Sequence, residues 1–115
     1  MTSDLIDHAV YAELKEATGA EFVMELVGAF LDEAPGMFAD LRNALQIGDS
    51  DGFRRAAHSI KSNANTFGAH ALAAPARDLE LIGRAEATPE VQALLARLDT
   101  EFERASDALK KLQNV

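Results

Sequence analysis

The sequence predicts an all-α protein, folded as an antiparallel, up-and-down four-helix bundle with a short extra N-terminal helix. Three observations favour this class. Apolar residues recur three and four positions apart along most of the chain, which is the spacing of one face of an α-helix. No segment shows the strict alternation and glycine-rich turns that half-buried strands need. The last apolar series, from Val91 to Leu112, is heptad-like and requires partner helices of similar length.

The first part of the chain is predicted to form a short helix, residues 5–17, followed by a long one that ends at Gly48. Thr18 is in position to cap the long helix, with Glu21 as its capping-box partner. An interior proline removes a backbone hydrogen bond. We therefore expect Pro35 to kink this second helix or to divide it into two stacked helices. Its buried face is expected to contain Phe22, Val23, Leu26, Phe30, Phe38, Leu41 and Leu45.

The middle of the chain predicts a helix over roughly residues 50–66, capped by Asp49 or Ser50. Gly68 is expected to close it with a positive φ. Its apolar residues fall on one face: Phe53, Ala56, Ala57, Ile60 and Ala64.

Two more helices complete the predicted bundle. In the first, residues 70–85, Pro75 is expected to make the first turn irregular because proline cannot donate a backbone hydrogen bond. The second begins with Thr88 as N-cap and Pro89 at the first helical position. We treat residues 1–115 as one domain.

Composition narrows the classes of function. The chain has 115 residues, a formal net charge of -8 and no cysteine. A strongly acidic protein is a poor ligand for nucleic acid, and the lack of cysteine excludes disulfides and thiolate metal sites. No apolar run is long enough to span a bilayer, and the N-terminus has no signal-peptide pattern. We therefore expect a cytoplasmic protein with no nucleic-acid or membrane partner.

The helix over residues 50–66 carries a histidine on its polar side. At 100° per residue, His58 lies about 140° from the centre of the apolar face. A neutral imidazole is a competent nucleophile, and an adjacent Lys61 suits the oxygens of a phosphoryl group. Arg54 would add positive potential, while the short side chains of Ser62 and Asn65 would let a partner approach. The alternative is an exposed histidine without a chemical role.

The stretch from His58 to Ala69 resembles the signature of histidine-containing phosphotransfer (HPt) domains. That pattern is H-x-[LI]-K-G, and here Lys61 stands three residues after His58, with Gly68 and Ala69 ten and eleven residues after it. Ser62 takes the place where the family most often has glycine. The similarity extends over nearly the whole chain, through residues 21–45, 49–57 and 75–84.

The resemblance implies a phosphorelay. His58 would accept a phosphoryl group from a receiver-domain phospho-aspartate, or from a kinase, and pass it to another receiver aspartate. The implied partners are response-regulator receiver domains and an upstream hybrid histidine kinase. The protein would be a monomer with no cofactor of its own, and Mg²⁺ would sit on the receiver. The chain has no P-loop or glycine-rich ATP lid, so we expect a phosphoryl carrier that cannot phosphorylate itself from ATP.

Other hypotheses stay open at this stage. A helical adaptor that binds a receiver without phosphoryl chemistry is the main alternative, and a hydrolase is less favoured because no base–nucleophile pair is evident. His8 and His70 are weaker candidates for the phosphorylated residue, and no metal site is expected. Met24, Val27 and Leu31 form an apolar stripe that either packs under the N-terminal helix or, near His58, contacts the partner.

Overall fold

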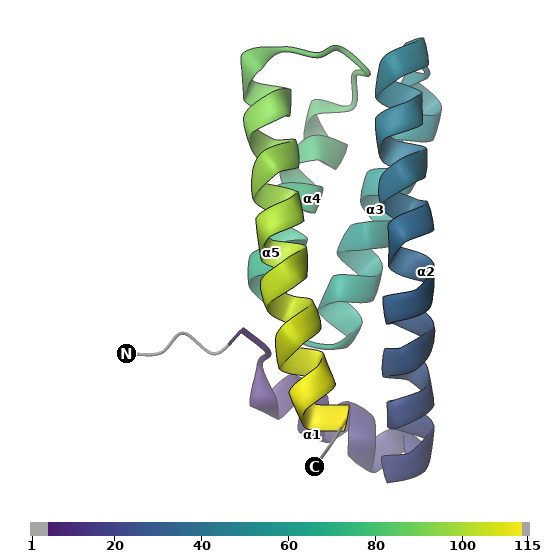
Figure 1. The fold of residues 1–115 in the computed structure, drawn as a ribbon, viewed down its shortest axis with the longest axis vertical. Helices are drawn as coiled ribbons and strands as arrows, with labels where there is room; N and C mark the ends of the chain where they lie inside the picture. Colours follow the sequence, from purple (N-terminus) through teal and green to yellow (C-terminus); the bar gives the residue numbers. More distant parts are fainter. Residues whose placement is uncertain (1–4, 114–115) are drawn as a thin grey trace.

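The computed structural model of the protein describes residues 5–113, which contain five α-helices and no strand. This confirms the predicted all-α class. The helices are α1 (His8–Thr18), α2 (Ala20–Ile47), α3 (Ser50–Thr66), α4 (His70–Ile82) and α5 (Pro89–Gln113). Figure 1 shows α2 to α5 side by side along the long axis of the molecule, with α1 across one end. Helices α2 and α4 each pack against both α3 and α5. Helices α3 and α5 therefore lie diagonally opposite each other in the bundle.

The junction between α1 and α2 differs from the prediction. Thr18 is the last residue of α1, and its hydroxyl donates a hydrogen bond of 2.8 Å to the Leu14 carbonyl. The hydroxyl is therefore occupied by its own helix, and the predicted Thr18 cap is wrong. Gly19 instead stands at the N-cap position of α2, where its φ of +93° suits glycine and no side chain caps the helix.

Helix α2 continues through Pro35 without a break, so the alternative of two stacked helices is wrong. Pro35 is exposed, and its nitrogen has no hydrogen to donate to the Leu31 carbonyl one turn earlier. The helix ends at Gly48 as predicted. This residue has a φ of +74°, and its N–H donates to the Ala44 and Leu45 carbonyls.

The core lies between the four long helices. The five apolar residues predicted for the inner face of α3 are all buried, and Phe53 has an exposed fraction of 0%. Burial of a phenylalanine side chain of this kind contributes about 1.5–3 kcal/mol. Phe30 of α2 connects three parts of the fold within the core, because its ring contacts Phe102 of α5 and Phe67 of the α3–α4 turn.

The expected burial of Phe22 is wrong, because its side chain is 49% exposed. The inner face of α2 is centred on Val23, Leu26, Val27 and Phe30, and Phe22 lies about 90° away from that centre on the helix. At this end of α2 the apolar face is too narrow to include it.

Helix α4 is regular from its first residue, contrary to the irregular first turn expected from Pro75. The N–H groups of Leu72 and Ala73 donate to the Ala69 carbonyl in the usual way. Pro75 lies in the helix and is buried. Its ring therefore fills space in the core. The hydrogen bond that is lost is the one that a backbone N–H at this position would have donated to the carbonyl of the exposed Ala71.

The α3–α4 turn holds the start of α1. Gly68 has the predicted positive φ, +76°, and its carbonyl accepts a hydrogen bond of 2.8 Å from the N–H of Asp7. Asp7 in turn caps α1 through bonds from the N–H groups of Ala9 and Val10. A Cβ atom on Gly68 would lie only 2.9 Å from both the Cβ and the carbonyl oxygen of Asp7. Glycine is therefore needed for its φ and for its small size.

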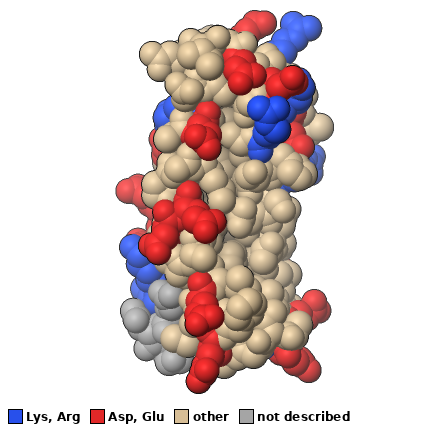
Figure 2. All heavy atoms as spheres, turned by 90° about the vertical axis from the view of Figure 1, so that its right-hand side faces the viewer, with Lys and Arg blue, Asp and Glu red and all other residues tan. Residues whose placement is uncertain are grey.

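The α2 side of the molecule is acidic. Figure 2 shows acidic side chains at intervals along the whole length of this side, whereas basic side chains gather in a few places. None of the helices within residues 5–113 is long and apolar enough to cross a membrane.

Candidate functional site

His58 lies in the middle of α3 on the side away from the core, as predicted. Its side chain is 58% exposed. The ring is held by one hydrogen bond, in which Nδ1 lies 2.9 Å from Oε2 of Glu80 on α4. Within residues 5–113 the other nitrogen, Nε2, makes no hydrogen bond and faces solvent. The site therefore presents one free ring nitrogen to an incoming partner.

Glu80 is the site residue that sequence reasoning missed. Its carboxylate joins two residues of α3, because Oε1 lies 2.7 Å from the Lys61 ammonium while Oε2 contacts His58. Oε1 is buried and receives no well-aligned hydrogen bond, so its contact with Lys61 is an ion pair. The only sequence signal was an acidic residue directly after Leu79, at the edge of a predicted apolar face. That signal does not reveal which helix the carboxylate faces.

The state of Glu80 decides which nitrogen of His58 carries the proton. The Lys61 ammonium, followed by the His58 ring, holds the pKa of Glu80 below its usual value, and partial burial opposes this effect. Glu80 is therefore a carboxylate at neutral pH and can only accept hydrogen bonds. Nδ1 of His58 must donate, so a neutral ring has its lone pair on the exposed Nε2.

Lys61 is half-buried and bound to Glu80, so in this state its ammonium is not free for a phosphoryl group. Ser62 and Asn65 are exposed on the same side of α3, as predicted. Asn65 is two turns from His58, about 10 Å along the helix axis, and does not contact it. Gly68 lies further along, at the turn described above.

Arg54 is less available than its position on α3 indicated. It forms an ion pair with Asp51 and donates a hydrogen bond of 3.2 Å to the Gly83 carbonyl. These contacts neutralise much of its charge and connect α3 to the end of α4. Arg54 still lines a shallow hollow of about 440 Å³ around the ring, together with Arg55, His58, Ser59 and Glu80.

The other histidines lie away from this hollow. Nε2 of His70 pairs with Oδ2 of Asp7 at a distance of 3.0 Å, which adds to the contacts that hold the start of α1. His8 is exposed on the first turn of α1. Among residues 5–113, no group of three or more histidine, aspartate or glutamate side chains is arranged to hold a metal ion.

The apolar stripe considered for partner binding is divided by the fold. Val27 is fully buried, Leu31 is half-buried and Met24 is 40% exposed. Met37 of α2 contacts Asn63 of α3, and Met24 lies about 20 Å further along α2 in the direction away from His58. The exposed part of the stripe is therefore not next to the histidine.

Comparison with known proteins agrees with this geometry. The Hpt domain family matches residues 25–108. The structure is similar to histidine-containing phosphotransfer protein B from Pseudomonas aeruginosa, with a TM-score of 0.85, 27% identity and coverage of 98% of this chain and 97% of that one.

A rice protein provisionally described as a histidine-containing phosphotransfer protein has the same fold, with a TM-score of 0.81 at 17% identity over 96% of this chain and 80% of that one. No curated protein sequence matched the chain. The chain therefore belongs to the Hpt domain family, the histidine phosphotransfer domains of phosphorelays.

Proposed function

We propose that His58 is the residue of this phosphotransfer domain that carries the phosphoryl group. The observation that supports this most directly is the hydrogen bond from Nδ1 to Glu80, which leaves an unprotonated Nε2 exposed to solvent. An exposed histidine without a role would not need a carboxylate from the neighbouring helix to orient its ring.

The geometry supports a simple transfer step. The Nε2 lone pair attacks the phosphorus of an aspartyl phosphate on a receiver domain, a nitrogen–phosphorus bond forms, and the bond from phosphorus to the aspartate oxygen breaks. The electron pair leaves with the carboxylate. The ring keeps its proton on Nδ1 and gains positive charge, which the Glu80 carboxylate stabilises at 2.9 Å. Transfer to a second receiver aspartate reverses these bond changes, and neither direction needs a net proton.

Lys61 is proposed to stabilise the phosphorylated state. A phosphoryl group on Nε2 brings close to two negative charges to the hollow. This charge competes with Glu80 for the ammonium, which lies one helical turn from His58. Arg54 adds positive potential from the same hollow, reduced by its pairing with Asp51. Ser62 and Asn65 are proposed to keep the surface low where the partner approaches, and Gly68 to hold the turn.

The family works between receiver domains and histidine kinases. For this chain we propose response-regulator receivers and an upstream hybrid histidine kinase as partners, a monomeric state, and a cytoplasmic location without nucleic-acid or membrane partners. The chain would hold no cofactor, and Mg²⁺ would be supplied by the receiver. We further propose that residues 1–115 form one domain, an antiparallel four-helix bundle in which Pro35 bends α2.

The test is phosphoryl transfer from a panel of receiver domains phosphorylated with labelled phosphate. The wild-type protein is expected to take up acid-labile, base-stable label, and His58→Gln is expected to take up none. Label that persists in His58→Gln would move the site to another histidine. Receivers that bind but transfer nothing would support the adaptor hypothesis instead.

A further inference from the structure

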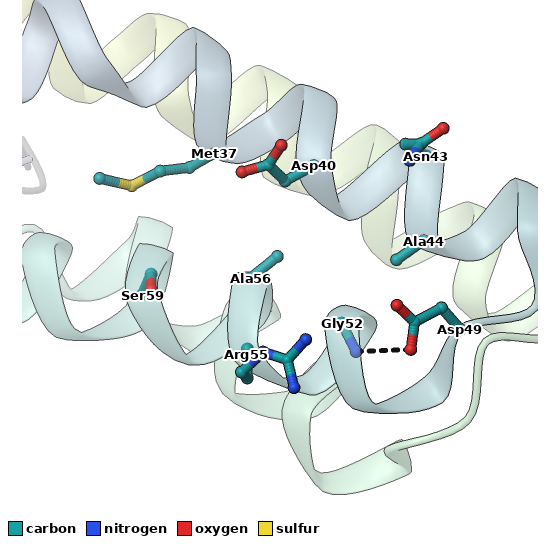
Figure 3. A pocket seen from close by; sticks show the side chains of 9 residues that line it. All are labelled: Met37, Asp40, Asn43, Ala44, Asp49, Gly52, Arg55, Ala56 and Ser59. Atoms are coloured by element: carbon teal, nitrogen blue, oxygen red, sulfur yellow. Dashed lines mark hydrogen bonds between the residues drawn. The ribbon is translucent and has the colours of Figure 1, made fainter.

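A groove of about 460 Å³ runs between α2 and α3, and the histidine hollow lies beside it. Its floor is low because Ala44, Gly52 and Ala56 have little or no side chain. Figure 3 shows the groove, with Asp40 and Asn43 projecting from α2 and Arg55 from α3. Arg55 and Ser59 line both the groove and the hollow. A partner side chain in the groove would therefore be separated from the histidine hollow by these two residues alone.

Two side chains of opposite charge, Arg55 and Asp40, line this groove but do not form an ion pair with each other. Arg55 and Asp40 are both exposed, and neither has a hydrogen bond or ion pair within residues 5–113. Two nearby cations are already paired, since Arg54 pairs with Asp51 and Lys61 with Glu80. The second carboxylate of the groove, Asp49, is also occupied, because it caps α3 through a 2.9 Å bond from the N–H of Gly52.

The positions of Arg55 and Asp40 define an orientation for a partner bound in the groove. Arg55 precedes His58 by one helical turn and lies between the groove and the hollow where the phosphoryl group would arrive. Asp40 lies across the groove on α2, on the acidic side of the molecule. A partner that binds along the groove meets positive charge near the reacting centre and negative charge beside it.

We propose that Asp40 and Arg55 determine which receiver domains bind this protein and in which orientation. This inference rests on the proposed function. The fitting receiver places its phosphoryl-bearing carboxylate group towards Arg55 and a lysine or arginine side chain against Asp40. A receiver with these charges reversed meets like charge at both points. Such complementary charges set association rate and partner choice more than maximal affinity.

The experiment measures the dissociation constant for each unphosphorylated receiver of the panel, at low and high salt, and kcat/KM for transfer from the phosphorylated form. Asp40→Asn and Arg55→Gln are each expected to weaken binding of the fitting receivers about fivefold at low salt, with the difference shrinking at high salt. Arg97→Gln and Asp107→Asn are matched controls. They make the same changes of charge at exposed positions on α5, which lies diagonally across the fold from α3.

Reversal of the charges tests specificity itself. Asp40→Lys and Arg55→Glu are expected to change the order in which the receivers of the panel bind, whereas Arg97→Glu and Asp107→Lys are expected to preserve it. Equal losses in the groove and control variants, or an unchanged order of receivers, would overturn the inference. If receivers bind but His58 takes up no label, the proposed function fails, and the binding constants still decide whether these two charges select the partner.

Discussion

The substitution Gly68→Ala should destabilise the protein far more than the same change at Gly48. Both glycines have nearly the same backbone, with φ of +76° and +74°. Alanine in this left-handed region costs about 1–2 kcal/mol at either position. The surroundings differ, because a Cβ on Gly48 has nothing within 4 Å, whereas one on Gly68 lies 2.9 Å from two atoms of Asp7.

The additional cost at Gly68 can be worked out from these contacts. Carbon atoms pack at about 3.5–4.0 Å, so the start of α1 must move by roughly half an ångström or more. This movement strains or breaks the 2.8 Å bond from the Asp7 N–H to the Gly68 carbonyl, whose loss costs about 1 kcal/mol net. Overpacking adds about 1 kcal/mol more. We expect Gly68→Ala to cost about 3–4 kcal/mol in total, about 2 kcal/mol more than Gly48→Ala.

Urea unfolding followed by circular dichroism measures both values. The slope of the unfolding free energy against urea should stay the same in the two variants, and the midpoint should fall further for Gly68→Ala. Equal midpoints would refute the argument, because they would mean that α1 does not press on the α3–α4 turn as the structure has it.

Three further outcomes are expected. Glu80→Gln keeps the shape of the side chain but removes its charge, and should lower single-turnover transfer to His58 about tenfold, the effect typical of losing a carboxylate that orients a histidine. Nitrogen-15 NMR of the ring should then show less of the Nδ1–H form, and an unchanged tautomer would speak against the assigned role. Phe53→Ala should cost about 3–5 kcal/mol of unfolding free energy because the ring is fully buried, whereas the exposed Phe22→Ala should change it by less than about 0.5 kcal/mol. The His70 ring holds the pKa of Asp7 below its usual value, so Asp7 contributes stability above about pH 4 and loses it as the pH falls through its folded pKa. Asp7→Asn, which caps a helix equally well, should therefore differ from wild type at neutral pH and converge with it in acid; a difference that does not depend on pH would contradict this account.

Much of the fold could be predicted because helix formation depends on local pattern. The apolar spacing in residues 50–66 identified the buried face of α3 residue by residue, and Thr88 caps α5 as expected, through a 3.1 Å bond from the Val91 N–H. The errors occur where packing overrides local signals. The Thr18 hydroxyl could bond either to a carbonyl of its own helix or to an N–H of the next helix, and it bonds to its own. Phe22 lies just outside the buried face of α2, whose width is set by α1 and the neighbouring helices.

The candidate site could likewise be predicted from the sequence only in part. The exposure of His58 and its neighbours on α3 follows from 100° per residue along one helix, so the sequence by itself determined that a histidine, a lysine and two short polar residues share one surface. Only the tertiary structure decided what these residues contact. Glu80 comes from α4 and Asp40 from α2, and their distances to α3 depend on how the helices pack rather than on any spacing along the chain. Tertiary packing therefore directs Lys61 to Glu80 and Arg54 to the Gly83 carbonyl, and it leaves Arg55 without a hydrogen bond or ion pair within residues 5–113.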